Sequence, residues 1–371
     1  RANVLRDFLT QNTKANPFNH PEIKEVMELC ISCKGCKSEC PSNVDMATLK
    51  AEFQFQFYQN NPRSFRDKLI ANNAQINNIV SKVPSLHNFI SRQKWFKKVI
   101  GIAKNRSLPQ LQKQTLYDFY SNHTQSKSSR KVYLFCDEYT NYYDVGIGQK
   151  AILLLNNLGY EVLMVEHNES GRAHISKGFL KSARALANAN VKQFNSLVSQ
   201  DIPLVGIEPS AILSFKDEYP NLVDKSLKAD ALELNKHVFL IEEFLYHEIT
   251  ANNIKIESFN KLSKSLLLHG HCHQKALSST YFTKKILAFP LNHSVTEINS
   301  GCCGMAGSFG YEVEHYDLSQ KIANQVLFPE LRKASPEIII VANGTSCRHQ
   351  IYDGIGKLAK HPIEVLFDAL Q

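Results

Sequence analysis

The chain has 371 residues, of which 43% are hydrophobic, and its formal charge of +8 is modest for this length. It contains no apolar run near the roughly 20 residues that a membrane-spanning helix needs. Arg6 and Asp7 interrupt its first apolar residues, which argues against a signal peptide. The length predicts two or three domains. Because the chain begins at Arg1 and enters a helical pattern at once, we expect it to be a fragment of a longer protein.

The first 60 residues are predicted to form a small all-α domain around a run of cysteines. Proline favours the first turn of a helix, so residues 21–29 are predicted to be helical. The cysteine run follows, and a second helix over residues 45–58 is predicted to be capped by Asp45. The run is Cys30, Cys33, Cys36 and Cys40, followed by Pro41.

This spacing, C-x2-C-x2-C-x3-C-P, is that of bacterial ferredoxins and predicts a [4Fe–4S] cluster. Gly35 permits a left-handed turn within the loop, and Lys34 and Lys37 are expected to offset the negative charge of the cluster. Zinc is disfavoured, because zinc motifs rarely place such steps in series. Two roles for Cys40 stay open. It either completes this cluster or serves another cluster whose remaining cysteines lie upstream.

Residues 61–131 are predicted to form a basic helical connector that ends in a polar, Ser-rich linker over residues 121–131. From residue 63 to residue 131 there are fourteen Lys and Arg against two acidic residues, Asp67 and Asp118. A basic amphipathic helix over residues 92–104 carries Trp95. It could lie on an anionic membrane, but we favour packing of Trp95 against a neighbouring domain. Nucleic-acid binding is not expected, because no known module accompanies the charge.

From residue 132 onwards, short apolar strands alternate with helices, which predicts an α/β architecture with largely parallel sheets. The predicted strands cover residues 132–135, 161–165, 204–207, 265–268, 295–298 and 337–341. The predicted helices cover residues 148–158, 175–189, 236–248, 314–327 and 363–370.

The α/β region is predicted to be a duplication, with a first lobe over residues 132–260 and a second over 261–371. Cys136 follows the first strand of one half, and Cys272 follows the matching strand 136 positions later. Ala211 and Cys347 match at the same offset, and Glu169-Ser170-Gly171 matches Cys302-Cys303-Gly304 at an offset of 133. The first half has thus lost most of its thiolates. A site made from Cys136, His167 and Glu169 is a weaker alternative.

We name the residues Cys272, Cys302, Cys303 and Cys347 the second cysteine cluster. Adjacent cysteines hardly bridge to each other, but both can face one metal centre if the loop bends tightly, and Gly301, Gly304 and Gly307 permit that bend. Nine cysteines in tight motifs indicate metal ligation in a reducing compartment. The second cysteine cluster is therefore predicted to hold an iron–sulfur cluster or zinc. Surrounding donors are expected from histidines that follow or adjoin these cysteines: His269, His271, His273 and His349.

These motifs resemble the CCG-domain (cysteine-rich) superfamily, although Gly344 stands where the last cysteine pair would begin. More narrowly, the chain resembles the C-terminal iron–sulfur region of large FAD-linked D-2-hydroxyacid dehydrogenases, a group with D-lactate and D-2-hydroxyglutarate dehydrogenases. The stretches that carry this resemblance are CISCKGCKSECPSNVDMATLKAEF from Cys30, ESGRAHISKG from Glu169, GIEPSA from Gly206, HGHCHQKAL from His269, GCCGMAGSFGYE from Gly301 and GTSCRHQI from Gly344.

The resemblance implies an oxidoreductase in which FAD, and the oxidation of the 2-hydroxyacid, belong to an upstream domain, with a further cysteine motif just before Arg1. This chain would then relay electrons from flavin to a quinone or a protein acceptor. Two alternatives remain: a thiol–disulfide redox protein like the heterodisulfide reductases, and a zinc-stabilised scaffold. We expect an oligomer in the cytoplasm, with peripheral contact at the inner face of the cell membrane as a further expectation.

Overall fold

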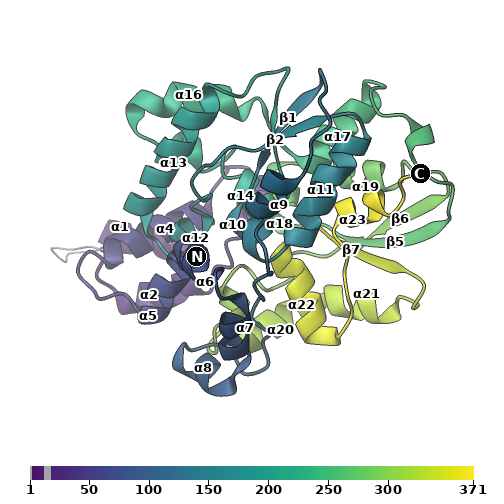
Figure 1. The fold of residues 1–371 in the computed structure, drawn as a ribbon. Helices are drawn as coiled ribbons and strands as arrows, with labels where there is room; N and C mark the ends of the chain where they lie inside the picture. Colours follow the sequence, from purple (N-terminus) through teal and green to yellow (C-terminus); the bar gives the residue numbers. More distant parts are fainter. Residues whose placement is uncertain (1, 12–17) are drawn as a thin grey trace.

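The computed structural model describes residues 2–11 and 18–371. Figure 1 shows an N-terminal helical region, a helical connector that includes α7 and α8, and two α/β lobes, each built on its own sheet. The predicted class, an α/β protein with parallel sheets and an N-terminal helical region, is confirmed.

The N-terminal region packs around a small apolar core that includes Met27, Phe53 and Phe57. Asp45 caps the last helix of this region as predicted, since its carboxylate accepts hydrogen bonds from the N–H groups of Ala47 and Thr48. The helices are α1 (Ala2–Gln11), α2 (Pro21–Glu28), α3 (Gly35–Glu39) and α4 (Met46–Phe57).

The connector consists of five short helices. The prediction of one basic helix over residues 92–104 is wrong. The backbone is extended at Gln93, which separates two helices where one was predicted over residues 92–104. Trp95 is 61% exposed and does not pack into a neighbouring domain. The helices are α5 (Phe65–Ala71), α6 (Asn73–Val80), α7 (Pro84–Arg92), α8 (Lys94–Val99) and α9 (Leu116–Asn122).

The first lobe contains a four-stranded parallel sheet with the order β2-β1-β3-β4. Apolar side chains from both faces are buried, as expected for a parallel sheet covered by helices. Its strands are β1 (Lys131–Phe135), β2 (Glu161–Leu163), β3 (Leu204–Gly206) and β4 (Val238–Leu240). Its helices are α10 (Glu138–Tyr142), α11 (Val145–Asn157), α12 (Arg172–Ser176), α13 (Leu180–Asn195), α14 (Pro209–Ile212), α15 (Tyr219–Leu222), η1 (Lys225–Leu227), α16 (Lys228–Asn235), α17 (Ile241–Thr250) and η2 (Ile256–Ser258).

The second lobe contains a three-stranded parallel sheet with the order β6-β5-β7. Lys360 forms an isolated parallel bridge with Val341 at the outer edge of β7, where the first lobe has its fourth strand. Its strands are β5 (Lys264–His269), β6 (His293–Glu297) and β7 (Ile339–Ala342). Its helices are α18 (Cys272–Leu277), α19 (Thr280–Leu287), η3 (Phe309–Tyr311), α20 (Tyr316–Gln325), α21 (Leu327–Lys333), α22 (Thr345–Ile355) and α23 (Pro362–Phe367).

The two lobes repeat one arrangement, because in each sheet the first strand lies between the second and the third. Three predicted helices differ from the structure. Residues 236–248 begin with strand β4 before α17 starts. The helix predicted over residues 175–189 is interrupted at Gly178, whose φ of +67° favours glycine. The helix predicted over residues 314–327 is two helices, α20 and α21.

The lobes are joined by buried polar contacts as well as by helix packing. The Glu208 carboxylate of the first lobe accepts a hydrogen bond of 2.9 Å from the Thr345 N–H at the start of α22. Arg106 of the connector is fully buried against the second lobe, where it donates to the Gly310 carbonyl and to the Ser319 hydroxyl. These bonds hold the loop that carries Cys302 and Cys303 between the connector and α20.

Across residues 2–11 and 18–371, every helix is too short or too polar to cross a membrane.

Candidate functional site

The N-terminal cysteine run wraps from the end of α2 to the end of α3. Two non-glycine residues of the loop, Ser32 and Lys34, adopt left-handed backbone conformations with φ of 51° and 62°. The prediction placed this turn at Gly35, which instead begins α3 with an ordinary φ. The strained residues flank Cys33 and turn its side chain towards the second lobe.

Three of the four sulfurs of the run lie near one another, and the fourth is set apart. Burial raises the pKa of Cys33, a hydrogen bond from the Gly35 N–H opposes the shift, and the nearby thiols Cys272, Cys30 and Cys36 raise it further. The Met46 N–H donates to the Cys36 sulfur at 3.3 Å. Such N–H donors suit thiolates that carry the charge of an iron–sulfur cluster.

Cys40 has different surroundings, since its sulfur faces three backbone N–H groups. Hydrogen bonds from Val44, Ser42 and Asn43 lower the pKa of Cys40. The thiols that influence Cys33 are those of the other run members and of Cys272, not that of Cys40. The Cys40 sulfur is therefore held by the backbone of residues 42–44, a position compatible with either of its two predicted roles.

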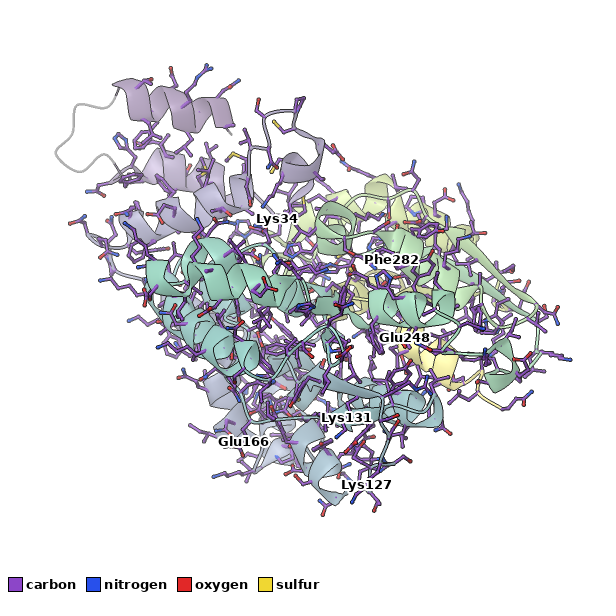
Figure 2. All side chains as sticks on the ribbon, turned by 90° about the horizontal axis from the view of Figure 1, so that it is seen from above. Lys34, Lys127, Lys131, Glu166, Glu248 and Phe282 are labelled. Atoms are coloured by element: carbon purple, nitrogen blue, oxygen red, sulfur yellow. The ribbon has the colours of Figure 1, made fainter. Side chains whose placement is uncertain are left out.

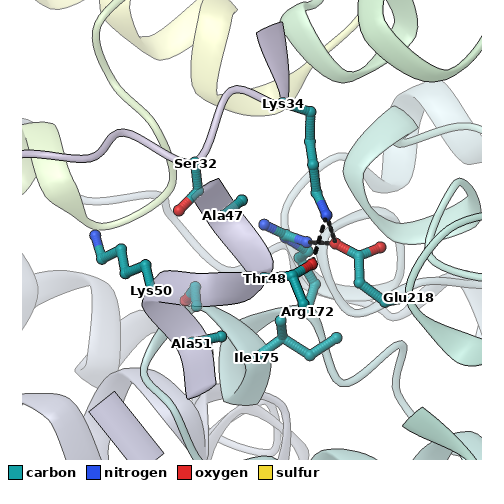
Figure 3. A pocket seen from close by; sticks show the side chains of 10 residues that line it. Ser32, Lys34, Ala47, Thr48, Lys50, Ala51, Arg172, Ile175 and Glu218 are labelled. Carbon is teal, nitrogen blue, oxygen red and sulfur yellow. Dashed lines mark hydrogen bonds and ion pairs between the residues drawn. The ribbon is translucent and has the colours of Figure 1, made fainter. Parts of the chain in front are cut away.

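Lys34 fixes the loop to the first lobe rather than offsetting cluster charge, which corrects the prediction. Its ammonium group is buried and lies 2.9 Å from Asp45, 2.6 Å from Asp217 and 3.1 Å from Glu218. Figure 2 shows Lys34 between the N-terminal helices and the lobes, and Figure 3 shows its bond to Glu218, which also binds Arg172. Burial opposes ionisation of Lys34, but the charges of Glu218 and Asp217 hold its pKa above the usual value.

Other side chains complete this contact between the loop and the rest of the chain. Lys37 also pairs with Asp217 instead of facing the sulfurs. Lys50, buried on α4, donates a hydrogen bond of 2.7 Å to the Cys30 carbonyl. A cavity of about 10 Å³ remains between Lys34 and Lys50, room for about one water molecule (Figure 3).

The second cysteine cluster is assembled from three loops at the carboxyl ends of the strands of the second sheet. Cys272 begins α18, and Cys347 lies in the first turn of α22, after β5 and β7 respectively. Cys302 and Cys303 lie in the loop after β6, where Gly304 and Gly307 adopt φ of +88° and +63° as the predicted bend requires. A Cβ atom at position 304 would overlap the Ser319 carbonyl, so the turn depends on glycine.

The four sulfurs form a connected chain in the interior. The Cys302 thiol interacts with those of Cys272 and Cys303, and Cys303 interacts in turn with Cys347 and with the His269 ring. Hydrogen bonds from Cys302 and Cys347 hold the pKa of Cys303 well below the usual value, so Cys303 is the preferred thiolate. A ring nitrogen of His269 and the sulfurs of Cys303 and Cys347 all lie within 4.8 Å of one another. This donor set suits a soft metal ion or an iron–sulfur cluster.

The other three predicted histidines have their own partners or lie further away. His271 Nε2 lies 3.9 Å from the Glu208 carboxylate, and its ring fills the space that a side chain at position 344 would need. His273 Nε2 is 2.8 Å from the Ser32 carbonyl of the N-terminal loop. His349 is partly buried beside the Tyr311 ring. Burial lowers the pKa of all three imidazoles.

The two cysteine sites are therefore neighbours. Helix α3 packs against α18, and the bond between Ser32 and His273 joins the two loops directly. A cavity of about 480 Å³ opens beside both sites, with Cys30, Cys272, Cys302 and Cys303 in its wall. Its opposite wall is formed by apolar connector side chains that include Ile70, Ile76, Phe96, Ile100 and Leu108.

The matching position in the first lobe holds no such site. Ser170, the counterpart of Cys303, donates its N–H and its hydroxyl to the buried carboxylate of Glu138. His167 accepts a hydrogen bond from the Cys136 N–H, and burial lowers the pKa of His167 to about 4. Across the described residues, Cys136, His167 and Glu169 are not among the groups whose ligand atoms all lie within 4.8 Å of one another.

One more acidic group has metal-like spacing, but cations of the chain already neutralise it. Glu312, Glu314 and His315 lie together near the end of the loop that follows Cys303. Lys177 and Arg66 both pair with Glu312, and the hydrogen bond from His315, with the charge of Lys177, lowers the pKa of Glu312 to about 2. This group holds the connector and α12 to the second lobe.

Several residues of the site were not identified from the sequence. Ser300 orients His269, Glu208 reaches the second lobe from the first, and Asp217 and Glu218 bind Lys34. These contacts join residues that are up to 184 positions apart, as for Lys34 and Glu218, so spacing gives no sign of them. Only Ser300 adjoins one of the cysteine motifs, since it stands directly before Gly301.

Comparison with known proteins agrees with this arrangement. Residues 1–45 match the family described as a 4Fe-4S dicluster domain. The chain is 27% identical over 384 residues to the D-2-hydroxyglutarate dehydrogenase of Pantoea ananatis, covering 99% of this chain and 36% of that protein. It is 28% identical over 378 residues to the D-2-hydroxyglutarate dehydrogenase of Haemophilus influenzae, covering 95% of this chain and 36% of that protein.

A second kind of relative matches a shorter region. One subunit of the anaerobic glycerol-3-phosphate dehydrogenase of Escherichia coli is 26% identical over 275 residues, covering 73% of this chain and 67% of that protein. No solved structure matches the chain. The chain spans about a third of the length of the D-2-hydroxyglutarate dehydrogenases it matches, and it is homologous to their C-terminal part, which confirms the resemblance seen in the motifs.

Proposed function

We propose that this chain is the iron–sulfur electron-transfer module of a dehydrogenase that oxidises a D-2-hydroxyacid, with D-2-hydroxyglutarate as the substrate suggested by the relatives. The oxidation itself belongs to a flavin-binding domain outside the residues described here. A [4Fe–4S] cluster held by Cys30, Cys33, Cys36 and either Cys40 or an upstream cysteine would supply one-electron redox chemistry. The second cysteine cluster is the neighbouring redox centre.

The observation that carries this proposal is the direct packing of the two cysteine sites. Electron transfer slows steeply with distance, and here Cys33 and Cys272 are close enough for their charges to influence each other. The bond between Ser32 and His273, with the buried ion pairs of Lys34, holds the two loops in a fixed relation. A scaffold that only needed two separate structural metals would have no reason to place them in contact.

The protein groups around the sulfurs have a defined role in this scheme. The N–H groups of Gly35 and Met46 donate to cluster thiolates, and such bonds stabilise the more negative, reduced state. Met27 and Phe53 of the neighbouring core exclude water from the Cys30 side. These groups adjust the reduction potential without taking part in bond breaking.

Redox titration of the anaerobically purified protein, followed by electron paramagnetic resonance (EPR), tests the proposal. We expect a reduced signal from the N-terminal cluster that Cys36→Ser removes, with the signal of the second cysteine cluster left in place, while Cys136→Ser, a change at a buried thiol in the first lobe, leaves both intact. A protein that contains stoichiometric zinc at both sites, with no redox-active signal, would contradict an electron-transfer role.

For the acceptor we propose a quinone at an anionic membrane surface, reached through the connector. Exposed apolar side chains accumulate on α5 to α8 and their caps, and no acidic residue lies between positions 68 and 117. The apolar residues are Phe65, Ile79, Val83, Leu86, Phe89, Trp95 and Val99. They alternate with the exposed cations Lys82, Arg92, Lys94 and Lys98. This pattern suits shallow insertion at a negatively charged surface.

Flotation with vesicles distinguishes this proposal from a soluble protein acceptor. Vesicles rich in phosphatidylglycerol should bind the protein at low salt, and vesicles of phosphatidylcholine should bind it much less. Phe89→Glu combined with Trp95→Glu should weaken binding, while Tyr352→Glu, at an exposed aromatic residue on α22, should not. Equal recovery with and without anionic lipid would argue for a soluble acceptor.

A further inference from the structure

His269 has an unusual environment for a buried histidine. It ends β5 and its side chain is fully buried. Nδ1 lies 2.8 Å from the Ser300 hydroxyl, whereas Nε2 has no hydrogen-bond partner. Most buried polar atoms have a hydrogen-bond partner, so an atom without one calls for an explanation.

The explanation lies in what the ring faces. A ring nitrogen of His269 is within 4.8 Å of the sulfurs of both Cys303 and Cys347. In the tautomer in which Nδ1–H donates to the Ser300 hydroxyl, Nε2 keeps a free lone pair. A hydroxyl on the other ring nitrogen is the arrangement that fixes the tautomer and orientation of a metal-binding histidine. His293 and His361 also have unpartnered Nε2 atoms, but across the described residues neither joins a cysteine group.

The first lobe provides an internal comparison at this position. By strand register His269 takes the place of Phe135, since Phe135 pairs with Gly206 and His269 with Ala342, whereas the sequence offset of 136 matches Phe135 with His271. Phe135 is buried among Phe194 and Phe215. The lobe without clustered thiols therefore places an apolar ring where the lobe with thiols places an imidazole.

We infer that His269 Nε2 is a direct ligand of the metal centre in the second cysteine cluster, together with Cys303 and Cys347. This inference rests on the proposed presence of a metal centre there and extends it to a mixed nitrogen and sulfur ligand set. One of Cys272 and Cys302, whose thiols adjoin that of Cys303, supplies the fourth position. Both iron–sulfur clusters and zinc accept histidine with cysteine.

The nitrogen ligand has a functional consequence. Where histidine replaces cysteine in an iron–sulfur centre, a neutral ligand replaces an anionic one and the reduction potential rises. An electron would then pass more favourably from the all-cysteine site at the N-terminal loop to the second cysteine cluster. A zinc ion in the same ligands has no redox chemistry and would make this centre structural.

Pulsed EPR of the reduced protein and X-ray absorption at the bound metal test the assignment. Wild type should show an imidazole nitrogen in the coordination sphere. His269→Gln should lose it and bind the metal about tenfold or more weakly. His269→Cys should retain metal with sulfur-only coordination. His293→Gln is the matched control, because it removes another buried imidazole with an unpartnered Nε2 and should change neither readout.

The failures of the two proposals are distinguishable. Sulfur-only coordination in the wild type, or a nitrogen signal that persists in His269→Gln, would overturn the His269 assignment and leave the relay standing. Absence of any metal at the second cysteine cluster would overturn both the assignment and the two-centre relay, even with the N-terminal cluster present.

Discussion

The two lobes share a scaffold and differ in what it holds. In both, the first strand is central, and a left-handed glycine follows the key residue of the second loop, Gly171 in one lobe and Gly304 in the other. At this loop the first lobe has Ser170, hydrogen-bonded to Glu138, and the second has Cys303, hydrogen-bonded to other thiols.

The difference teaches that the loop geometry does not depend on metal ligation. The first lobe forms the same turn with a hydroxyl and a carboxylate, both buried and paired. The first lobe contributes to the site through Glu208. The Glu208 carboxylate accepts a hydrogen bond at the start of α22 and lies near His271. We therefore regard the first lobe as a support that positions the second cysteine cluster.

The largest contrast is expected from cysteine substitution in the second lobe. Cys303→Ser removes the central sulfur of the four and the preferred thiolate, so the second cysteine cluster should lose its metal. Ser170→Ala at the matching position of the first lobe should leave metal content unchanged. Elemental analysis of both purified variants measures this, and equal metal content in the two would contradict the distinction between the lobes.

The second largest effect is expected from substitutions at the contact between the N-terminal loop and the first lobe. Lys34→Met removes the one fully buried cation among Asp45, Asp217 and Glu218, leaving Lys37 on Asp217 and Arg172 on Glu218, and should cost up to about 3 kcal/mol of unfolding free energy. Lys37→Met, at a more exposed partner of Asp217, should cost about 1 kcal/mol or less. Urea unfolding compares the two. Similar losses would mean that Lys34 does not hold the loop to the lobe.

Within the first lobe, the Ser170 hydroxyl should affect the stability of the fold but not its metal content. Ser170→Ala leaves one oxygen of the buried Glu138 without its donor, which should lower the unfolding free energy by about 1–3 kcal/mol. Ser176→Ala, whose hydroxyl bonds only to the carbonyl one turn before it, is the control and should cost less. An unchanged midpoint for Ser170→Ala would show that Glu138 finds another donor.

The alternation of strands and helices and the offset of 136 positions were enough to predict parallel sheets and a repeated arrangement, while the metal sites predicted from cysteine spacing stay predictions. All six predicted strands are present. Strand β4 was missed because residues 238–240 continue without a break into α17. The packing of the two cysteine sites could not be predicted, since it depends on long-range ion pairs such as that of Lys34 with Asp217. The exposure of Trp95 could not be predicted either, because it depends on how the connector packs against the rest of the chain.

The smallest predicted effect is a difference in pH dependence. Burial, and then the charge of Glu138, raise the pKa of Glu169 to about 8, and burial lowers the pKa of His174 beside it, so both are neutral and their separation of 3.8 Å is not an ion pair. The folded state holds this proton more tightly than the unfolded state. Glu169 therefore stabilises the fold at low pH, and its contribution declines as pH rises from about 4.5 to about 8.

Glu169→Gln removes this titration while preserving the shape of the side chain. Its unfolding free energy should decline less steeply than that of wild type across this pH range, by at most about 1.4 kcal/mol per pH unit. Glu233→Gln, at an exposed residue on α16, should follow the wild type. Parallel curves for Glu169→Gln and wild type would show that Glu169 titrates normally in the folded protein.

The most direct test of the account is an EPR-monitored redox titration of the wild type and of Cys303→Ser, because it asks whether two adjacent centres exist. Two redox-active centres with magnetic interaction are expected in the wild type, and an isolated N-terminal cluster signal in the variant. Identical spectra from the two proteins would contradict a redox centre in the second lobe and, with it, the proposed relay.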